Sequence, residues 1–120
     1  MWIPLLALIA GLAAGFLSRL SIPAAYADYL AISLLAALDS VFGGIRAGLS
    51  RTFNARVFIS GFFTNTLLAA LLTYFGGHLG VDLMVPASVA FGIRIFQNLG
   101  IIRNLLLNRA TARLQPPTAM

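Results

Sequence analysis

Long apolar stretches and short polar breaks alternate along the whole chain. The apolar stretches cover residues 1–17, 29–49, 57–75 and 88–108, and the breaks between them contain arginine, proline and glycine. A helix needs about 20 apolar residues to cross the hydrocarbon core of a bilayer. The pattern therefore predicts an all-α, polytopic membrane protein with four transmembrane helices and short loops. A version with three spans, in which the first or the second helix lies in the membrane interface, is the alternative.

The last apolar stretch carries three strongly polar residues near its middle. Arg94, Gln97 and Asn98 are spaced i, i+3 and i+4, so a helix places them on one face. An arginine at the centre of a membrane costs about 3 kcal/mol on insertion scales. We therefore expect partners for Arg94 from another helix of the chain or from another copy of it.

Two other stretches also carry polar residues at membrane depth. Asp39 and Arg46 lie in the second stretch and Asn65 lies in the third. Polar groups in hydrocarbon need hydrogen-bonding partners, which favours a buried polar network, although Arg46 could instead extend to the nearby interface. One aspartate against two arginines leaves a surplus of positive charge. The predicted network comprises Asp39, Arg46, Asn65, Arg94, Gln97 and Asn98.

Glycines within the stretches predict where helices approach one another closely. Small residues on one face let two helix backbones come near, and such pairs are frequent in membranes. The predicted helix-packing positions are Gly11, Gly15, Gly43, Gly44 and Gly92.

A short sequence pattern occurs twice in the chain. Ser-Val followed by Gly-Ile-Arg is found at residues 40–46 and again at residues 88–94. Interpreted as a duplication, it predicts two repeated helical hairpins with parallel second and fourth helices, and with Arg46 and Arg94 at similar depth. Chance similarity between apolar segments is the alternative.

The composition excludes a separate soluble domain. Of the 120 residues, 60% are hydrophobic and 9% are charged, against about 25% charged in typical soluble domains. Cysteine is absent, which excludes disulfides and thiolate chemistry. The net charge of +5 comes from arginines placed mainly between and after the apolar stretches. This is the pattern of membrane topology and not of a nucleic-acid-binding face, so nucleic acid is not an expected partner.

The positions of the arginines predict the orientation of the chain. With four spans, Arg51, Arg56 and the arginines near the C-terminus fall on one side, and Arg19 falls on the other. Cytoplasmic loops carry the excess of arginine, so both termini are predicted to lie in the cytoplasm of a multi-pass cell-membrane protein. Residues 1–108 would form a single transmembrane domain, and residues 109–120 a flexible, basic, proline-containing cytoplasmic tail.

The sequence contains no catalytic constellation. Asp39 is the only carboxylate at membrane depth, and neither histidine nor cysteine accompanies it. His78 and Asp82 are spaced i, i+4 in a glycine-rich turn, but two ligands are too few for a specific metal motif. We therefore expect no enzyme, no catalytic residue, no metal site and no cofactor.

Four runs of residues resemble the small basic protein family. They are AALDSVFGGIRA at 36–47, VFISGFFTNTLLAALLTYFG at 57–76, LGVDL at 79–83 and FGIRIFQNLGIIR at 91–103. Members of this family are short bacterial integral membrane proteins of uncharacterised molecular function, whose genes commonly lie among cell-division and envelope genes. The resemblance implies an envelope or division association through gene neighbourhood, and it supplies no catalytic residues.

Two functions fit these features. The first is a membrane assembly or scaffold protein, in which the polar network holds helices or protomers together. Its expected partners are membrane lipids, further copies of the chain and other envelope or division membrane proteins. The alternative is a homo-oligomer with an arginine-lined site for an anionic lipid headgroup or a small anion, serving transport or lipid binding, because guanidinium groups bind phosphate through paired hydrogen bonds.

Overall fold

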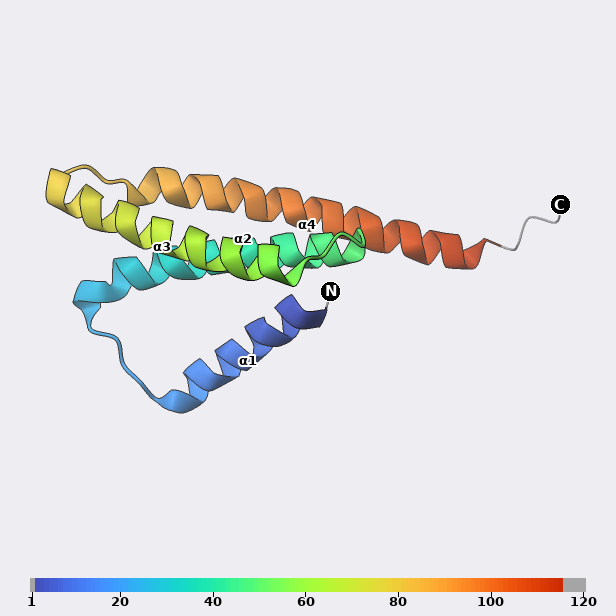
Figure 1. Ribbon diagram of the computed structural model, residues 1–120, viewed down its shortest axis with the longest axis horizontal. Helices are drawn as coiled ribbons and strands as arrows, with labels where there is room; N and C mark the ends of the chain where they lie inside the picture. Colours follow the sequence, from blue (N-terminus) through green and yellow to red (C-terminus); the bar gives the residue numbers. More distant parts are fainter. Residues whose placement is uncertain (1, 116–120) are drawn as a thin grey trace.

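The computed structural model describes residues 2–115. It consists of four α-helices and one short 3-10 turn, and residues 2–115 contain no β-strand. The helices are α1 (Trp2–Ser18), α2 (Ala27–Leu49), α3 (Ala55–Leu79) and α4 (Met84–Leu114), and the turn η1 is Ala24–Tyr26. The predicted all-α fold with four helices is confirmed (Figure 1).

Three of the helices are long and apolar enough to cross a membrane. These are α2 together with the turn before it, α3 and α4. The apolar helix α1 has 17 residues, which is about 26 Å of helix against a hydrocarbon core of about 30 Å. The fold is therefore that of a membrane protein with three helices of spanning length and one shorter apolar helix.

Side chains in the connections determine where α3 and α4 begin. The side-chain oxygen Oδ1 of Asn54 accepts hydrogen bonds from the backbone N–H groups two and three residues further on, at 3.0 and 3.3 Å. Oδ1 of Asp82 does the same at the start of α4, at 3.1 and 3.3 Å. These N–H groups have no partner inside the helix, so the caps let both helices begin before the predicted apolar stretches.

The central helix of the molecule is α2. Both α3 and α4 pack along α2 and contact each other far less, while α1 packs mainly against α2. Helices α2 and α4 run in the same direction, and α1 diverges from the bundle toward its C-terminal end (Figure 1). The main cluster of buried apolar residues contains three alanines, and small residues of this kind are usual where membrane helices approach closely. Its members are Ile32, Ala36, Ala69, Ala87 and Phe91.

Only one of the predicted packing glycines lies at a very close contact within the chain. A Cβ atom on Gly44 would lie 2.9 Å from Cγ of Pro4 and 2.9 Å from Cδ2 of Phe58. The absent side chain lets the first turn of α1 dock on α2, and Pro4 is fully buried there. Gly43 has a looser neighbour, since Nδ2 of Asn98 would lie 3.7 Å from its Cβ.

The other three predicted packing glycines do not mediate contacts between helices of the chain. A Cβ atom on Gly11, Gly15 or Gly92 would have no neighbouring heavy atom within 4 Å. For the two glycines of α1 the reason is that this helix diverges from α2 beyond its first turns (Figure 1). Gly11 instead borders an apolar cavity of about 370 Å³ between α1, α2 and α3.

The last helix continues beyond the predicted end of the transmembrane domain. α4 runs to Leu114, so the boundary between residues 108 and 109 does not separate helix from tail. Arg109 lies within the helix, and its Nη2 donates a hydrogen bond to the carbonyl oxygen of Leu49 at 2.6 Å. The helix ends just before Pro116, as expected because the residue preceding a proline disfavours helical geometry. Residues 116–120 of the predicted tail lie outside the described part of the chain.

Candidate functional site

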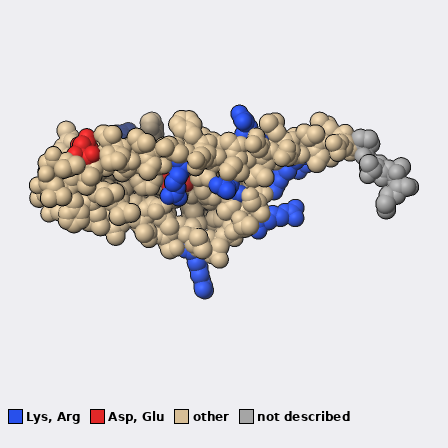
Figure 2. All heavy atoms as spheres, turned by 90° about the horizontal axis from the view of Figure 1, so that it is seen from above, with Lys and Arg blue, Asp and Glu red and all other residues tan. Residues whose placement is uncertain are grey.

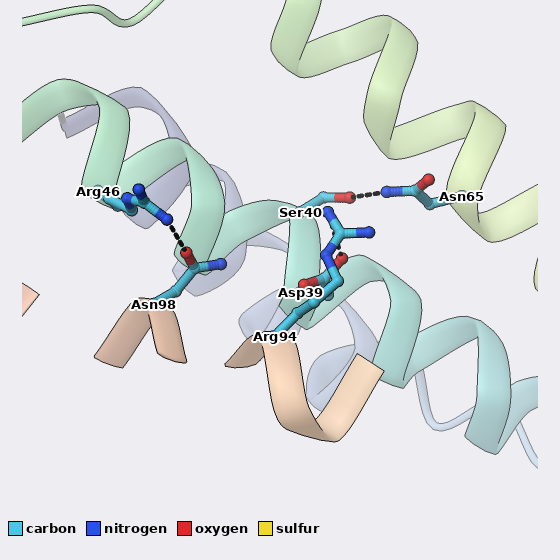
Figure 3. Close-up of polar contacts among 6 residues, drawn as sticks. All are labelled: Asp39, Ser40, Arg46, Asn65, Arg94 and Asn98. Carbon is cyan, nitrogen blue, oxygen red and sulfur yellow. Dashed lines mark hydrogen bonds and ion pairs between the residues drawn. The ribbon is translucent and has the colours of Figure 1, made fainter. Parts of the chain in front are cut away.

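An ion pair joins the middle of α2 to the N-terminal half of α4. Nη2 of Arg94 lies 3.2 Å from Oδ2 of Asp39 (Figure 3). The side chain of Asp39 is fully buried, whereas that of Arg94 is 56% exposed. The structure thus brings together the carboxylate and the deeper arginine that the sequence singles out, and it leaves part of the guanidinium uncovered.

The carboxylate of Asp39 is poorly satisfied despite this ion pair. Neither of its oxygens accepts a hydrogen bond of acceptable geometry from residues 2–115. The contact with Arg94 is therefore an attraction between charges without a well-directed N–H···O bond. A buried oxygen without a donor costs about 1–3 kcal/mol, so this position favours a water molecule or another polar group from outside the chain.

A second polar contact joins the same two helices nearer their C-terminal ends. Nη1 of Arg46 donates a hydrogen bond to Oδ1 of Asn98 at 3.1 Å (Figure 3). Asn98 is buried and electrically neutral, so it orients the guanidinium without balancing its charge. Within residues 2–115, no carboxylate pairs with Arg46. The surplus positive charge is therefore located at Arg46.

The third helix joins this set of contacts through an amide. Nδ2 of Asn65 donates a hydrogen bond to the hydroxyl oxygen of Ser40 at 3.4 Å, which links α3 to α2 (Figure 3). Ser40 follows Asp39 directly in the chain, and sequence reasoning did not assign it a partner. Each of these three polar contacts therefore has one partner on α2.

The two arginines lie at different depths, contrary to the prediction from the repeated pattern. Arg94 pairs with Asp39, whereas Arg46 lies seven positions later on the parallel helix α2 and pairs with Asn98. Seven residues of helix correspond to about 10 Å. α2 and α4 do run in the same direction, but helix packing shifts their alignment relative to that of the repeated sequence.

Two adjoining cavities follow these polar side chains. The larger, about 500 Å³ in volume, is named here the arginine cavity. Its lining consists of Gly43, Arg46, Ala47, Ser50, Thr52, Arg94, Gln97 and Asn98. The smaller, of about 260 Å³, reaches Asp39 and Asn65 and is bordered on α3 by apolar side chains. Four of the six predicted polar residues line the arginine cavity, namely Arg46, Arg94, Gln97 and Asn98. Asp39 and Asn65 line the smaller cavity, which Arg94 also borders.

His78 and Asp82 make contacts with neighbouring backbone groups. The ring nitrogen Nδ1 of His78 lies 2.9 Å from the carbonyl oxygen of Tyr74, one turn earlier in α3. Asp82 caps α4 through the hydrogen bonds described above. Within residues 2–115 there is no cluster of three or more histidine, cysteine or acidic side chains.

The charges are distributed unevenly along the molecule. Arginine side chains gather on the half next to the C-terminal extension of α4, while acidic atoms appear near the opposite end and beside one central arginine (Figure 2). The α2–α3 connection, which contains Arg51, belongs to the basic half, because Arg109 contacts the end of α2. Asp28 and Asp82 lie at the starts of α2 and α4, at the other end.

These features define a polytopic α-helical membrane protein whose helices are joined by polar contacts at membrane depth. The chain belongs to the family described as "Protein of unknown function (DUF1290)", which matches residues 22–107.

Curated relatives agree with this family. The chain is 50% identical over 111 residues to a protein of Bacillus subtilis (strain 168) called "Small basic protein", with 92% of each chain covered. It is 42% identical over 102 residues to an uncharacterized protein of Mycobacterium tuberculosis (strain ATCC 25618 / H37Rv), with 83% of this chain and 84% of the relative covered. The resemblance to the small basic protein family is confirmed. No solved structure matches the chain.

Proposed function

We propose that this protein is an assembly protein of the bacterial cell membrane, and that the face of α4 around Arg94 binds a second copy of the chain. The observation that carries the proposal is the half-exposed guanidinium of Arg94, about three turns into a helix long enough to span the membrane. The role in the envelope or division machinery is the part of the proposal that depends on family resemblance alone.

The exposed part of Arg94 is unsuited to contact with lipid chains. Intramembrane arginines nearly always face a bundle interior, a partner or a water-filled cavity, because hydrocarbon cannot solvate the charge. Asp39 occupies one edge of the guanidinium and leaves donors free on the other. A second copy would supply acceptors such as the side-chain oxygen of its own Gln97, which is exposed on the same face.

The residues around Arg94 also suit a helix–helix contact. Ala90 and Gln97 lie one turn on either side of Arg94, and both are exposed. A small residue lets a partner helix approach, and an amide forms hydrogen bonds across the interface. The internal contacts of Asp39 and Asn98 would fix the position of α4 on α2, and thereby the surface that the partner meets.

Crosslinking in intact membranes tests this proposal. The chain contains no cysteine, so single cysteines at Ala90 or Gln97 can be oxidised or joined with a short bis-maleimide without background. We expect covalent dimers from both positions, because Cα atoms about 4.4–6.8 Å apart form disulfides. Phe96→Cys is the matched control, since this side chain is 77% exposed on the opposite face of α4.

The crosslinking results distinguish a second copy of the chain from a different membrane protein as the partner. Dimers that disappear when Arg94→Gln is added support an interface built on the guanidinium. A crosslinked product containing a different protein assigns the face to another membrane partner and overturns the homo-oligomer. Equal crosslinking from positions 90, 96 and 97 would show that α4 has no preferred face, and the proposal would fail.

We also infer that the basic half of the molecule faces the cytoplasm, with both termini on that side when α1 crosses the bilayer. The support is the excess of arginine in and after the α2–α3 connection. In intact cells, we expect an impermeant maleimide to label Val81→Cys at the acidic end and to leave Thr52→Cys unlabelled until the membrane is opened. The reverse pattern would invert the topology.

A further inference from the structure

We propose that the arginine cavity binds the phosphate group of an anionic phospholipid from the leaflet next to the α2–α3 connection. The inference is drawn from the lining of the cavity and does not depend on the assembly role proposed above.

The charge balance of the spans calls for one anion. Asp39 lies beside Arg94, whereas Arg46 has only the neutral Asn98 as its partner among residues 2–115. Two guanidinium groups and one carboxylate leave a single positive charge, which no acidic side chain of residues 2–115 balances. The phosphodiester of a phospholipid carries one negative charge and would balance it.

The lining of the cavity offers donors suited to phosphate oxygens. Arg46 uses Nη1 for Asn98, and its other N–H groups remain available toward the cavity that it lines. Guanidinium groups bind phosphate through two parallel hydrogen bonds. Neutral donors stand beside them in the amide of Gln97 and the hydroxyl of Ser50. The volume of about 500 Å³ lies within the range of about 300–1,000 Å³ typical of small-ligand sites.

The position of the cavity favours a lipid over a free phosphate ion. Arg46 lies in the last turn of α2, at the depth where a membrane helix meets the headgroups. The adjoining cavity is bordered by Val57, Phe58 and Phe62 of α3. An apolar wall next to a cationic pocket matches a molecule that carries a phosphate at one end and hydrocarbon at the other.

Lipid retention in nanodiscs tests the inference. The full chain would be reconstituted in phosphatidylcholine nanodiscs containing a minority of phosphatidylglycerol, and the lipid that stays bound after transfer to detergent would be counted by native mass spectrometry. We expect Arg46→Gln to retain about tenfold less phosphatidylglycerol, the effect of losing one charge-assisted contact. Arg103→Gln is the matched control, because Arg103 is exposed on α4 and does not line the cavity.

A displacement experiment identifies the source of the phosphate, and two further variants test whether the loss of lipid reflects misfolding. Displacement of phosphatidylglycerol by millimolar inorganic phosphate would support the phosphate site with the free ion as its source, and resistance to displacement would support the lipid. Arg46→Lys, which keeps the charge, should retain more phosphatidylglycerol than Arg46→Gln. Ser50→Ala removes one hydroxyl without touching the charge and should weaken retention less than Arg46→Gln.

Two results would overturn the inference. One is equal retention of phosphatidylglycerol by Arg46→Gln and Arg103→Gln, and the other is equal retention of phosphatidylcholine and phosphatidylglycerol by the unmodified chain. Crosslinking from position 90, which does not line the cavity, in the Arg46→Gln background reports separately on the assembly proposal, so either proposal can fail alone.

Discussion

Replacing Arg94 with leucine is expected to lower the free energy of unfolding by about 3–4 kcal/mol. This is the lower part of the range found when a buried ion pair loses one partner, because Asp39 is buried but Arg94 is itself 56% exposed. The fully buried carboxylate of Asp39 would remain, and no other cationic side chain of residues 2–115 pairs with it. Its oxygens accept no hydrogen bond that could compensate within the described chain. The loss should therefore exceed that of an arginine without a carboxylate beside it, such as Arg103.

A double-mutant cycle would isolate this interaction. Unfolding by sodium dodecyl sulfate in mixed micelles would be followed for Arg94→Leu, Asp39→Leu and the double variant. Removing both charges should recover most of the stability, because two apolar side chains need no partner in the membrane. Arg103→Leu provides the control and should change stability by less than about 1 kcal/mol. Additive losses in the cycle would mean that the two groups do not act as a pair.

Gly76→Ala is expected to be the next most damaging substitution, with a loss of about 3 kcal/mol, the upper end of the effect of overpacking. A Cβ atom on Gly76 would lie 2.6 Å from the carbonyl oxygen of Val81 and 3.1 Å from the backbone nitrogen of Leu83. Both neighbours are backbone atoms of the turn into α4, and the amide of Val81 bonds to the Gly76 carbonyl at 3.0 Å. The turn would have to open, and α4 would lose its position on α2.

The adjacent glycine provides a matched control. A Cβ atom on Gly77 has no neighbouring heavy atom within 4 Å, and the residue shares the same helix. Gly77→Ala should therefore leave the thermal midpoint in detergent unchanged or slightly higher, since alanine is the better helix former. Similar losses at both positions would show that helix flexibility, and not the contact with the turn, requires these glycines.

The spans and the principal polar residues could be predicted from the sequence because both depend on properties of one helix at a time. Apolar length determines which segments enter a bilayer, and a charge such as Asp39 or Arg94 stands out against that background. The same reasoning predicts that Arg94 needs a partner, and the structure supplies Asp39. Asn65 is recognised from the sequence as an amide at membrane depth that needs a partner, but its partner Ser40 is not.

The remaining features depend on how helices align, which local pattern does not determine. The repeated Ser-Val and Gly-Ile-Arg pattern placed Arg46 and Arg94 level, but packing sets Arg94 beside Asp39 instead. Gly11 and Gly15 have the spacing of a close contact, yet α1 diverges before they could meet α2. The pairing of Arg109 with the end of α2 joins residues 60 positions apart and gives no local signal.

The length of α4 has a consequence for any protein that binds the basic half of the molecule. α4 has 31 residues, about 46 Å of rod against a hydrocarbon layer of about 30 Å. The part of α4 that exceeds this thickness includes Arg109 and Arg113. Arg109 is hydrogen-bonded to the carbonyl oxygen of Leu49, the last residue of α2. A soluble protein that bound there would contact a cationic helix that is already ordered, so binding would not carry the entropic cost of ordering it. Because α4 is one continuous helix, a displacement of this end would be transmitted to its membrane-spanning part.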